Sequence, residues 1–440
     1  MIFYIIVLIT ILCLYKYFTR TFNYWKDKNV AGPKPIPLFG NFKEAVMRKK
    51  PKVVLYNEIY KQYPEEKVVG MYLMTTPVLL IRDLDIVKQV MIKDFESFPD
   101  RGANFSKEGL GENIFHCDAE TWKMLRHRFT SVFTSSKLKR MFPLLIQNSD
   151  RLINYVDNLT MKKPELDVYE TIMKYTVATS CATIFGWDID TFNEDIAWPT
   201  TFDNHQNISH LQEMDMVFPG IVNKLNLSLL DEKVRNISRQ ILNKAITEQS
   251  DTNNVFNVKD VLLNMKKESD NDKEANTKIT DSLLAGQVWL FHTTAYLNNA
   301  LILSHALYQL ARNPEVQAKL REEINNAMEQ HGNILTYEVL KEMKYIEMVF
   351  EETLRIQPTS PGHTRACRED VKIEGTDLTI NKGTLVIIPA YSIHHDEKYY
   401  PEPEQFIPER FLQENSKERH PCAYVSALEH VKTNIKIQKI

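Results

Sequence analysis

The chain begins with an apolar run, and most of the remainder has hydrophobic positions at helical spacing. Residues 1–15 carry no charged side chain, and the first basic residues, Lys16 and Arg20, follow this run. A small-residue cleavage site is missing, and basic residues retained near the end of an apolar run favour the cytoplasmic side of a membrane. An apolar run of about 18 residues is near the lower limit for crossing a bilayer. Residues 1–20 are therefore predicted to form an uncleaved membrane anchor.

A proline-rich segment follows the predicted anchor. It contains Pro33, Pro35 and Pro37, and each proline fixes φ and removes a backbone hydrogen-bond donor. A segment of this composition is stiff and extended. We expect residues 21–45 to form a hinge that holds the following domain at a fixed angle to the membrane.

Strand-like patterns occur in two parts of the chain. The run 68–82 reads as two strands joined at residues 75–77, and short apolar runs return over 372–390, separated by glycine-containing turns. Asp83 is expected to cap a helix that continues to Met91. These two parts predict a small β portion.

Helical patterns account for most of the other residues. Residues 145–245 are mostly helical in pattern, and Thr280 fits as the cap of a long helix that ends near Arg312. That helix is apolar on all sides and therefore belongs in the core. The charged run 266–277 is expected to be a solvated, mobile loop. The predicted fold class is mainly α with a small β portion (α+β).

Composition narrows the possible partners and the cellular compartment. The chain has 440 residues and a formal net charge of −3, which argues against nucleic acid as a partner. Its five cysteines have no CxxC spacing, which suits free thiols in a reducing compartment. No Pro/Gly/Ser linker divides the chain, so we expect one domain over residues 46–424 and an atypical tail over 425–440.

Two charged motifs stand some fifty residues apart near the end of the chain. Glu352 and Arg355 lie three positions apart in a segment with helical spacing, so their side chains share one helix face. An isolated pair of this kind is usually a solvated surface pair. Arg410, in Pro408-Glu-Arg-Phe411, offers a second guanidinium to the same carboxylate. A glutamate between two arginines can fix distant segments together.

These two motifs together resemble the cytochrome P-450 family, the haem-thiolate monooxygenases, and the resemblance is closest to microsomal insect members that handle xenobiotics. It implies the fold of that family and haem as the cofactor. It also implies that Glu352, Arg355 and Arg410 form a structural triad, which locks the segment leading into the haem-binding loop.

The resemblance assigns three further residues to the haem. Trp122 and Arg126 are four positions apart on a predicted helix, so an indole N–H and a guanidinium can meet one anion. Any amphipathic helix can show this spacing by chance. In the family, residues at these two positions and at that of Arg365 bind the haem propionates. The i, i+4 spacing of His363 and Cys367 would also allow a metal site, and ordinary polar contacts are the alternative interpretation.

An apolar patch lies over residues 214–225. The resemblance places there the lid of the substrate channel, which dips into the membrane surface, while an ordinary helix-loop-helix core fits the pattern equally well.

The chain departs from the family pattern where the axial ligand belongs. The family sets a Cys thiolate in a glycine-rich loop after the Pro-Glu-Arg-Phe motif, and thiolate ligation favours O–O cleavage. Here residues 425–440 contain neither Cys nor Gly, and the last glycine is Gly383. Cys422 lies before the expected loop and is interpreted as a structural residue, so no metal ligand is assigned. A missing internal stretch and an unrelated tail are two hypotheses for this incomplete carboxy terminus.

A second departure lies in the long apolar helix. The family usually has an acid followed by a threonine there, which deliver protons to bound oxygen, and a locally widened helix. Leu297 and Asn298 stand at the matching positions. Leucine cannot relay a proton, and asparagine is hardly an acid at neutral pH. Thr293 and Thr294, one turn earlier, are partial substitutes.

Two functional hypotheses follow from the resemblance. In the first, the protein is a monooxygenase of the endoplasmic reticulum membrane that faces the cytosol. It would oxidise small lipophilic compounds, xenobiotics or endogenous lipids and hormones, with O2 and electrons from NADPH-cytochrome reductase and cytochrome b5. In the second, it is a truncated, haem-deficient, non-catalytic isoform or an incomplete gene model with the same fold.

Overall fold

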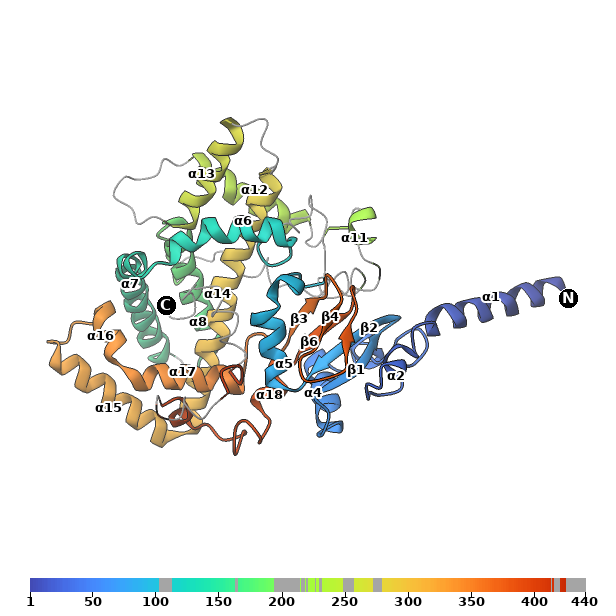
Figure 1. The fold of residues 1–440 in the computed structure, drawn as a ribbon. Coiled ribbons are helices and arrows are strands. Elements are labelled where there is room, and N and C mark those ends of the chain that lie inside the picture. Colours follow the sequence, from blue (N-terminus) through green and yellow to red (C-terminus); the bar gives the residue numbers. More distant parts are fainter. Residues whose placement is uncertain are drawn as a thin grey trace.

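The computed structural model describes most of the chain. The described residues are 1–102, 113–162, 165–193, 214, 218, 221–225, 227–228, 232–247, 257–271, 279–412, 414 and 420–424. They form a mainly helical molecule with a small β portion, as predicted (Figure 1). The predicted tail, 425–440, and much of the apolar patch at 214–225 lie outside the described residues.

The amino-terminal helix stands apart from the rest of the molecule. Helix α1 (Ile2–Thr19) projects away from the body in Figure 1, and it has no buried residue. Among the described helices, it is the one long and apolar enough to cross a membrane. Three short or medium helices follow it: α2 (Tyr24–Asp27), α3 (Lys43–Val46) and α4 (Lys52–Gln62).

The main sheet joins two distant parts of the chain. It contains β1 (Val68–Leu73), β2 (Thr76–Ile81), β3 (His363–Ala366) and β6 (Leu385–Ile388), in the order β1-β2-β6-β3. The β1–β2 and β3–β6 pairs are antiparallel, and β2 runs parallel to β6. A separate two-stranded sheet is formed by β4 (Val371–Lys372) and β5 (Thr379–Ile380).

The strand pattern predicted five of these six strands and missed β3. Its sequence, His-Thr-Arg-Ala, has little of the β-branched and aromatic character that marks a strand. Backbone pairing holds it in place, because His363 to Ala366 face Ile388 to Leu385 of β6 in register.

The helical body is built around one long helix. Helix α14 (Asp281–Arg312) begins at its predicted cap, where Thr280 Oγ1 accepts from Leu283 N at 3.1 Å. Every side chain from 283 to 293 is buried, which confirms its place in the core. The other described helices and helical turns are α5 (Leu84–Lys88), η1 (Gln89–Lys93), η2 (Phe95–Ser97), α6 (Ala119–Thr130), η4 (Ser131–Phe133), α7 (Ser135–Thr160), α8 (Val168–Ser180), η5 (Cys181–Phe185), α11 (Ile221–Lys224), α12 (Glu232–Thr247), α13 (Val258–Asn271), α15 (Pro314–Gln330), α16 (Tyr337–Glu342), α17 (Lys344–Ile356), α18 (Ala390–His394) and η7 (Pro408–Phe411). Helix α14 packs against α8, α12 and α17.

Two predicted boundaries need correction. The run 266–271 was expected to be loop but forms the last turns of α13, where Lys266 pairs with Asp270 at 3.2 Å and with Asp281 at 2.9 Å. Ion pairs at i,i+4 support a charged helix that the composition alone predicts as loop. The helix capped by Asp83 changes at residue 89 into a π-helical turn, η1, in place of continuing as an α-helix to Met91.

Candidate functional site

Glu352 and Arg355, the two residues of the predicted triad that belong to α17, lie together in the core. Arg355 donates from Nε to Glu352 Oε2 at 2.7 Å and from Nη2 to Glu352 Oε1 at 2.9 Å. Both side chains are fully buried. A fork of two parallel hydrogen bonds is the strong form of an ion pair, and it fixes the orientation of both groups.

Arg410 reaches the same carboxylate from η7. Its Nε donates to Glu352 Oε1 at 3.3 Å, and the backbone N–H of Ile407 donates to that oxygen at 2.9 Å. Burial lowers the pKa of Arg410, and the Glu352 carboxylate opposes this shift. The structure thus brings all three residues of the triad together.

Arg355 also connects α17 to two other segments. It donates from Nη1 to the carbonyl of His394 at 2.8 Å and from Nη2 to that of Gln405 at 3.2 Å. One buried guanidinium therefore ties α17 to the end of α18 and to the approach to η7. This arrangement positions the 401–411 segment against the helical body.

A second ion pair, at the surface, also holds η7, and the sequence did not predict it. Glu409, next to Arg410, pairs with Lys319 of α15 at 2.5 Å and accepts from the hydroxyl of Tyr345 at 3.1 Å. Nothing in the sequence links Lys319 to Glu409, because the contact depends on how α15 and η7 pack.

Residues 420–424 form a turn that buries Cys422 and Ala423. Tyr424 stacks on His394, with ring centroids 5.7 Å apart, and meets Phe411 edge-on at 5.2 Å. Cys422 is fully buried in the core around the main sheet. Burial raises the pKa of its thiol to about 11. Enclosure of this thiol in the core is consistent with the structural role predicted for Cys422.

Arg126 is the residue with the clearest requirement for an anion. It lies on α6, whose amino terminus is capped by Asp118, an acceptor from Thr121 N at 2.9 Å. The Nη2 atom of Arg126 is buried and has no hydrogen-bond partner among the described residues. Burial lowers the pKa of this guanidinium to about 10. A desolvated cation with an unused donor fits a carboxylate such as a haem propionate.

Trp122 and Arg365 flank one segment that passes between α6 and β3. Trp122 lies 5.5 Å from Phe95, measured between ring centroids. Asp100 bridges to Ala366, the neighbour of Arg365 in β3. Arg365 is itself buried and donates to the carbonyl of Thr364 at 2.9 Å. Segment 95–102 thus connects the surroundings of both predicted propionate residues.

The middle of α14 lies close to α6. Phe291 contacts Phe129 of α6, with ring centroids 4.6 Å apart. The buried run of α14 ends at Thr293, and Thr294 is exposed while Leu297 and Asn298 are half-buried. Thr294 Oγ1 donates to Leu290 O at 2.7 Å, within a helix that is regular over its whole length. The local widening expected from the resemblance is therefore not seen in α14.

Thr293 Oγ1 is buried and has no hydrogen-bond partner in the described part of the chain. One residue earlier, His292 lies on the side facing α8, where its Nδ1 is 3.2 Å from Ser180 Oγ. Neither Thr293 nor the contact of His292 with Ser180 supplies a carboxylic acid to this part of α14. The chemistry of the 293–298 segment therefore rests on hydroxyl and amide groups.

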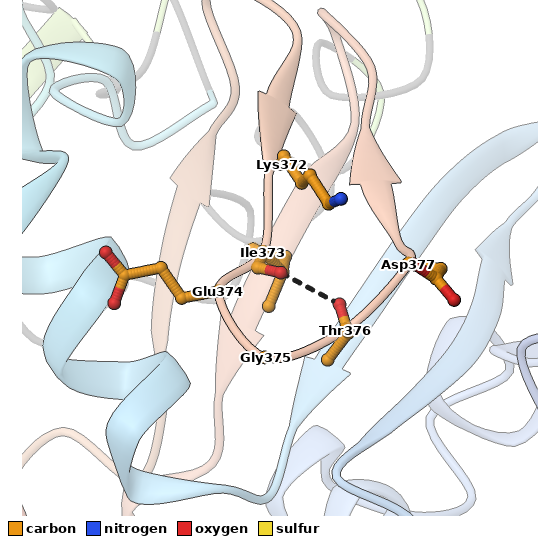
Figure 2. Close-up of a pocket in the computed structure, with 6 residues that line it drawn as sticks. All are labelled: Lys372, Ile373, Glu374, Gly375, Thr376 and Asp377. Carbon is orange, nitrogen blue, oxygen red and sulfur yellow. Dashed lines mark hydrogen bonds between the residues drawn. The ribbon is translucent and has the colours of Figure 1, made fainter.

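Two further observations concern ligand chemistry in the described residues. A hollow at the turn between β4 and β5 is lined by residues 372–377, and Figure 2 shows Thr376 Oγ1 donating to Ile373 O at 3.0 Å. All its lining residues belong to one turn, and Glu374 pairs with Lys93 at 2.5 Å. No group of three His, Cys, Asp or Glu side chains that could hold a metal ion occurs within the described residues. No function is assigned to this hollow.

Comparisons with known proteins agree on one family. The profile of the family described as Cytochrome P450 matches residues 30–426. The chain is 43% identical over 434 residues to Cytochrome P450 6B1 of Papilio polyxenes, covering 96% of this chain and 87% of that protein. It is 42% identical over 428 residues to Cytochrome P450 6B2 of Helicoverpa armigera, covering 96% of this chain and 85% of that protein. Identity to Cytochrome P450 6k1 of Blattella germanica is 33% over 439 residues, covering 94% of this chain and 83% of that protein.

Proposed function

Since the chain belongs to the cytochrome P450 family, whose members are haem-dependent monooxygenases, we propose that it oxidises small lipophilic compounds at a membrane. The observation that carries this proposal is the buried Nη2 atom of Arg126, which has no hydrogen-bond partner among the described residues. Haem, when bound, supplies the activation of O2. The contribution of the chain is to hold the haem carboxylates, with Arg126, Trp122 and Arg365 as partners.

The proposed location is the endoplasmic reticulum membrane, with the domain facing the cytosol. Helix α1 supports this proposal, because it is uncharged up to Lys16 and basic residues follow its apolar run. In this arrangement residues 1–20 anchor a domain that covers 46–424. NADPH-cytochrome reductase would supply electrons from the same membrane surface, with cytochrome b5 as a second donor.

Arg126 can be tested through the binding of haem itself. Haem and its dimethyl ester differ only in the propionate charges, so a guanidinium that binds a propionate must distinguish them. A hydrogen bond to a charged group contributes about 1.5–3 kcal/mol, which corresponds to roughly 10- to 150-fold in affinity. We expect the chain to prefer haem over its dimethyl ester. The Arg126→Gln variant should show a smaller preference, because Trp122 and Arg365 remain as the other proposed partners of the carboxylates.

The matched control is Arg128→Gln on the same helix. Arg128 already pairs with Glu268 at 2.6 Å, so its loss leaves the discrimination between haem and ester unchanged. Equal affinity of the unmodified chain for both compounds would contradict the role of Arg126. Turnover is tested separately, with reductase, NADPH and a lipophilic coumarin ether, and inhibition by carbon monoxide as the control.

A second candidate function is a membrane-bound protein with this fold that does not turn over substrate. The burial of Cys422 in the core around the main sheet favours it. Absence of reductase-dependent product from a folded, membrane-bound chain would support this alternative.

A further inference from the structure

The ring of Trp122 has an aromatic neighbour from another segment. Trp122 is half-buried on α6, so the core does not enclose its side chain on all sides. The ring of Phe95, in η2, lies 5.5 Å from the indole ring, measured between centroids, and the two ring planes are tilted by 49°. A tilted contact between aromatic rings at this distance is favourable and directional. Phe95 therefore restricts the plane of the Trp122 ring.

A buried amide holds the backbone next to Phe95. Gln89 of η1 is 2% exposed, and its Nε2 donates to Asp94 Oδ2 at 2.7 Å and to Lys372 O at 3.0 Å. Its Oε1 accepts from Glu374 N at 3.0 Å. Lys372 and Glu374 belong to the turn drawn in Figure 2. One side chain thus binds the residue that precedes Phe95 to the turn between β4 and β5.

The chain beyond Phe95 is fixed to β3 and to the residues that follow this strand. The carbonyl of Ser97 accepts from Arg368 N at 2.9 Å. The carbonyl of Asp100 accepts from Ala366 N at 2.8 Å. Asp100 Oδ2 also pairs with Arg368 Nε at 2.8 Å. The backbone that carries the Phe95 ring is therefore held in place on both sides.

From these contacts we propose that Phe95 is a positioning residue for the haem carboxylates and that Gln89 holds it in place. Phe95 acts through Trp122, whose indole N–H is the donor. The inference rests on the proposed function, in which Trp122 binds a carboxylate together with Arg126 and Arg365. A hydrogen bond weakens steeply when its N–H points away from the acceptor. The plane of the indole ring therefore decides how well the donor meets the carboxylate.

The dissociation constant of haem dimethyl ester divided by that of haem measures this effect in the full chain. A variant that only loosens the domain weakens the binding of both compounds alike, and this ratio stays the same. We expect Phe95→Ala, at a half-buried position, to lower the ratio by roughly three- to tenfold, because a bond to a charged group is weakened. Phe95→Tyr keeps the ring and should restore the ratio.

A double variant tests whether Phe95 acts through Trp122. Trp122→Phe removes the donor, so adding Phe95→Ala in that background should not lower the ratio further. Gln89→Leu should lower the ratio of the otherwise unmodified chain, since it frees the start of η2 from the β4–β5 turn. Glu96→Gln serves as the control, because it breaks only a surface pair with Lys123 at 2.9 Å, beside the ring contact. Its ratio should equal that of the unmodified chain.

The outcomes separate this inference from the proposed function. Equal affinity of the unmodified chain for haem and its ester would contradict the binding of the haem carboxylates itself. A clear preference for haem that is unchanged in Phe95→Ala would overturn only the positioning role of Phe95. An equal loss from Phe95→Ala with and without Trp122 would also overturn that role. Phe95→Ala decides the proposal even where Gln89→Leu does not fold.

Discussion

The carboxylate of Glu352 receives both hydrogen bonds that Arg355 directs at it, and neither side chain is exposed to solvent. The other two segments held by Arg355 accept through backbone carbonyls, so the pair acts as a joint between parts of the chain. A buried ion pair costs desolvation, and its contribution lies in fixing one arrangement of the segments that it joins.

Removal of Glu352 should strongly destabilise the domain. Glu352→Ala strands the fully buried guanidinium of Arg355 and removes one acceptor from Arg410. Loss of one partner of a buried pair costs roughly 3–5 kcal/mol. The free energy of unfolding in urea measures this loss. Glu338→Ala is the control, because Glu338 and its partner Lys139 are both more than half exposed. Equal stability of the two variants would contradict a joint at Glu352.

Deletion of residues 1–20 should weaken membrane association without affecting the fold. The sheet and the hydrogen bonds of Trp25 to Met71 and Tyr72 remain complete in this variant. Its helical circular dichroism and its melting curve should therefore match those of the full domain. Carbonate extraction of both proteins gives the comparison. Release of the full-length chain by carbonate would argue against a spanning helix.

Cys422 should resist alkylation in the folded protein. Because burial raises its pKa to about 11, the reactive thiolate is scarce at pH 8, and the fully buried sulphur is shielded from reagent. Peptide mapping after iodoacetamide treatment should show labelling only after unfolding. The same protein unfolded in guanidinium chloride gives the reference for a fully reactive thiol. Rapid labelling of Cys422 at pH 8 would contradict a structural role.

Leu297 and Asn298 should limit the coupling of electron supply to product formation. In a form that carries a glycine-rich Cys loop after Tyr424, we expect Leu297→Glu with Asn298→Thr to raise the product formed per NADPH and to lower hydrogen peroxide. The reason is that a carboxylic acid and an alcohol can transfer protons where leucine cannot. Asn299→Thr is the neighbouring control, since Asn299 Nδ2 donates to Ala295 O within the helix. No change in coupling would indicate that Thr293 or Thr294 already serves this purpose.

Much of the fold was predictable because its signals are local. Thr280 and Pro314 mark the start of α14 and of α15, and Asp83 caps α5, each through chemistry within a few residues. The turn between β1 and β2 follows equally from the sequence around Thr75. Local capping and turn chemistry thus placed these elements correctly.

The remaining features depend on contacts between distant residues. Strand β3 exists because β6 lies beside it, and the pair of Lys319 with Glu409 joins residues that the sequence separates widely. The open donor of Arg126 is visible only once α6 is packed and its surroundings are known. Sequence resemblance identified Arg126, while its burial gave the physical reason for an anion partner.

The central claim is that this 440-residue polypeptide keeps the residues that bind the haem carboxylates but has no thiolate for the iron. The reduced carbon-monoxide difference spectrum tests this claim most directly. We predict no red-shifted Soret band of the thiolate type from the unmodified polypeptide supplied with haem. The same polypeptide with a glycine-rich Cys loop after Tyr424 should give that band. A clear thiolate-type band from the unmodified chain, lost in Cys422→Ser, would contradict this account and identify Cys422 as the ligand.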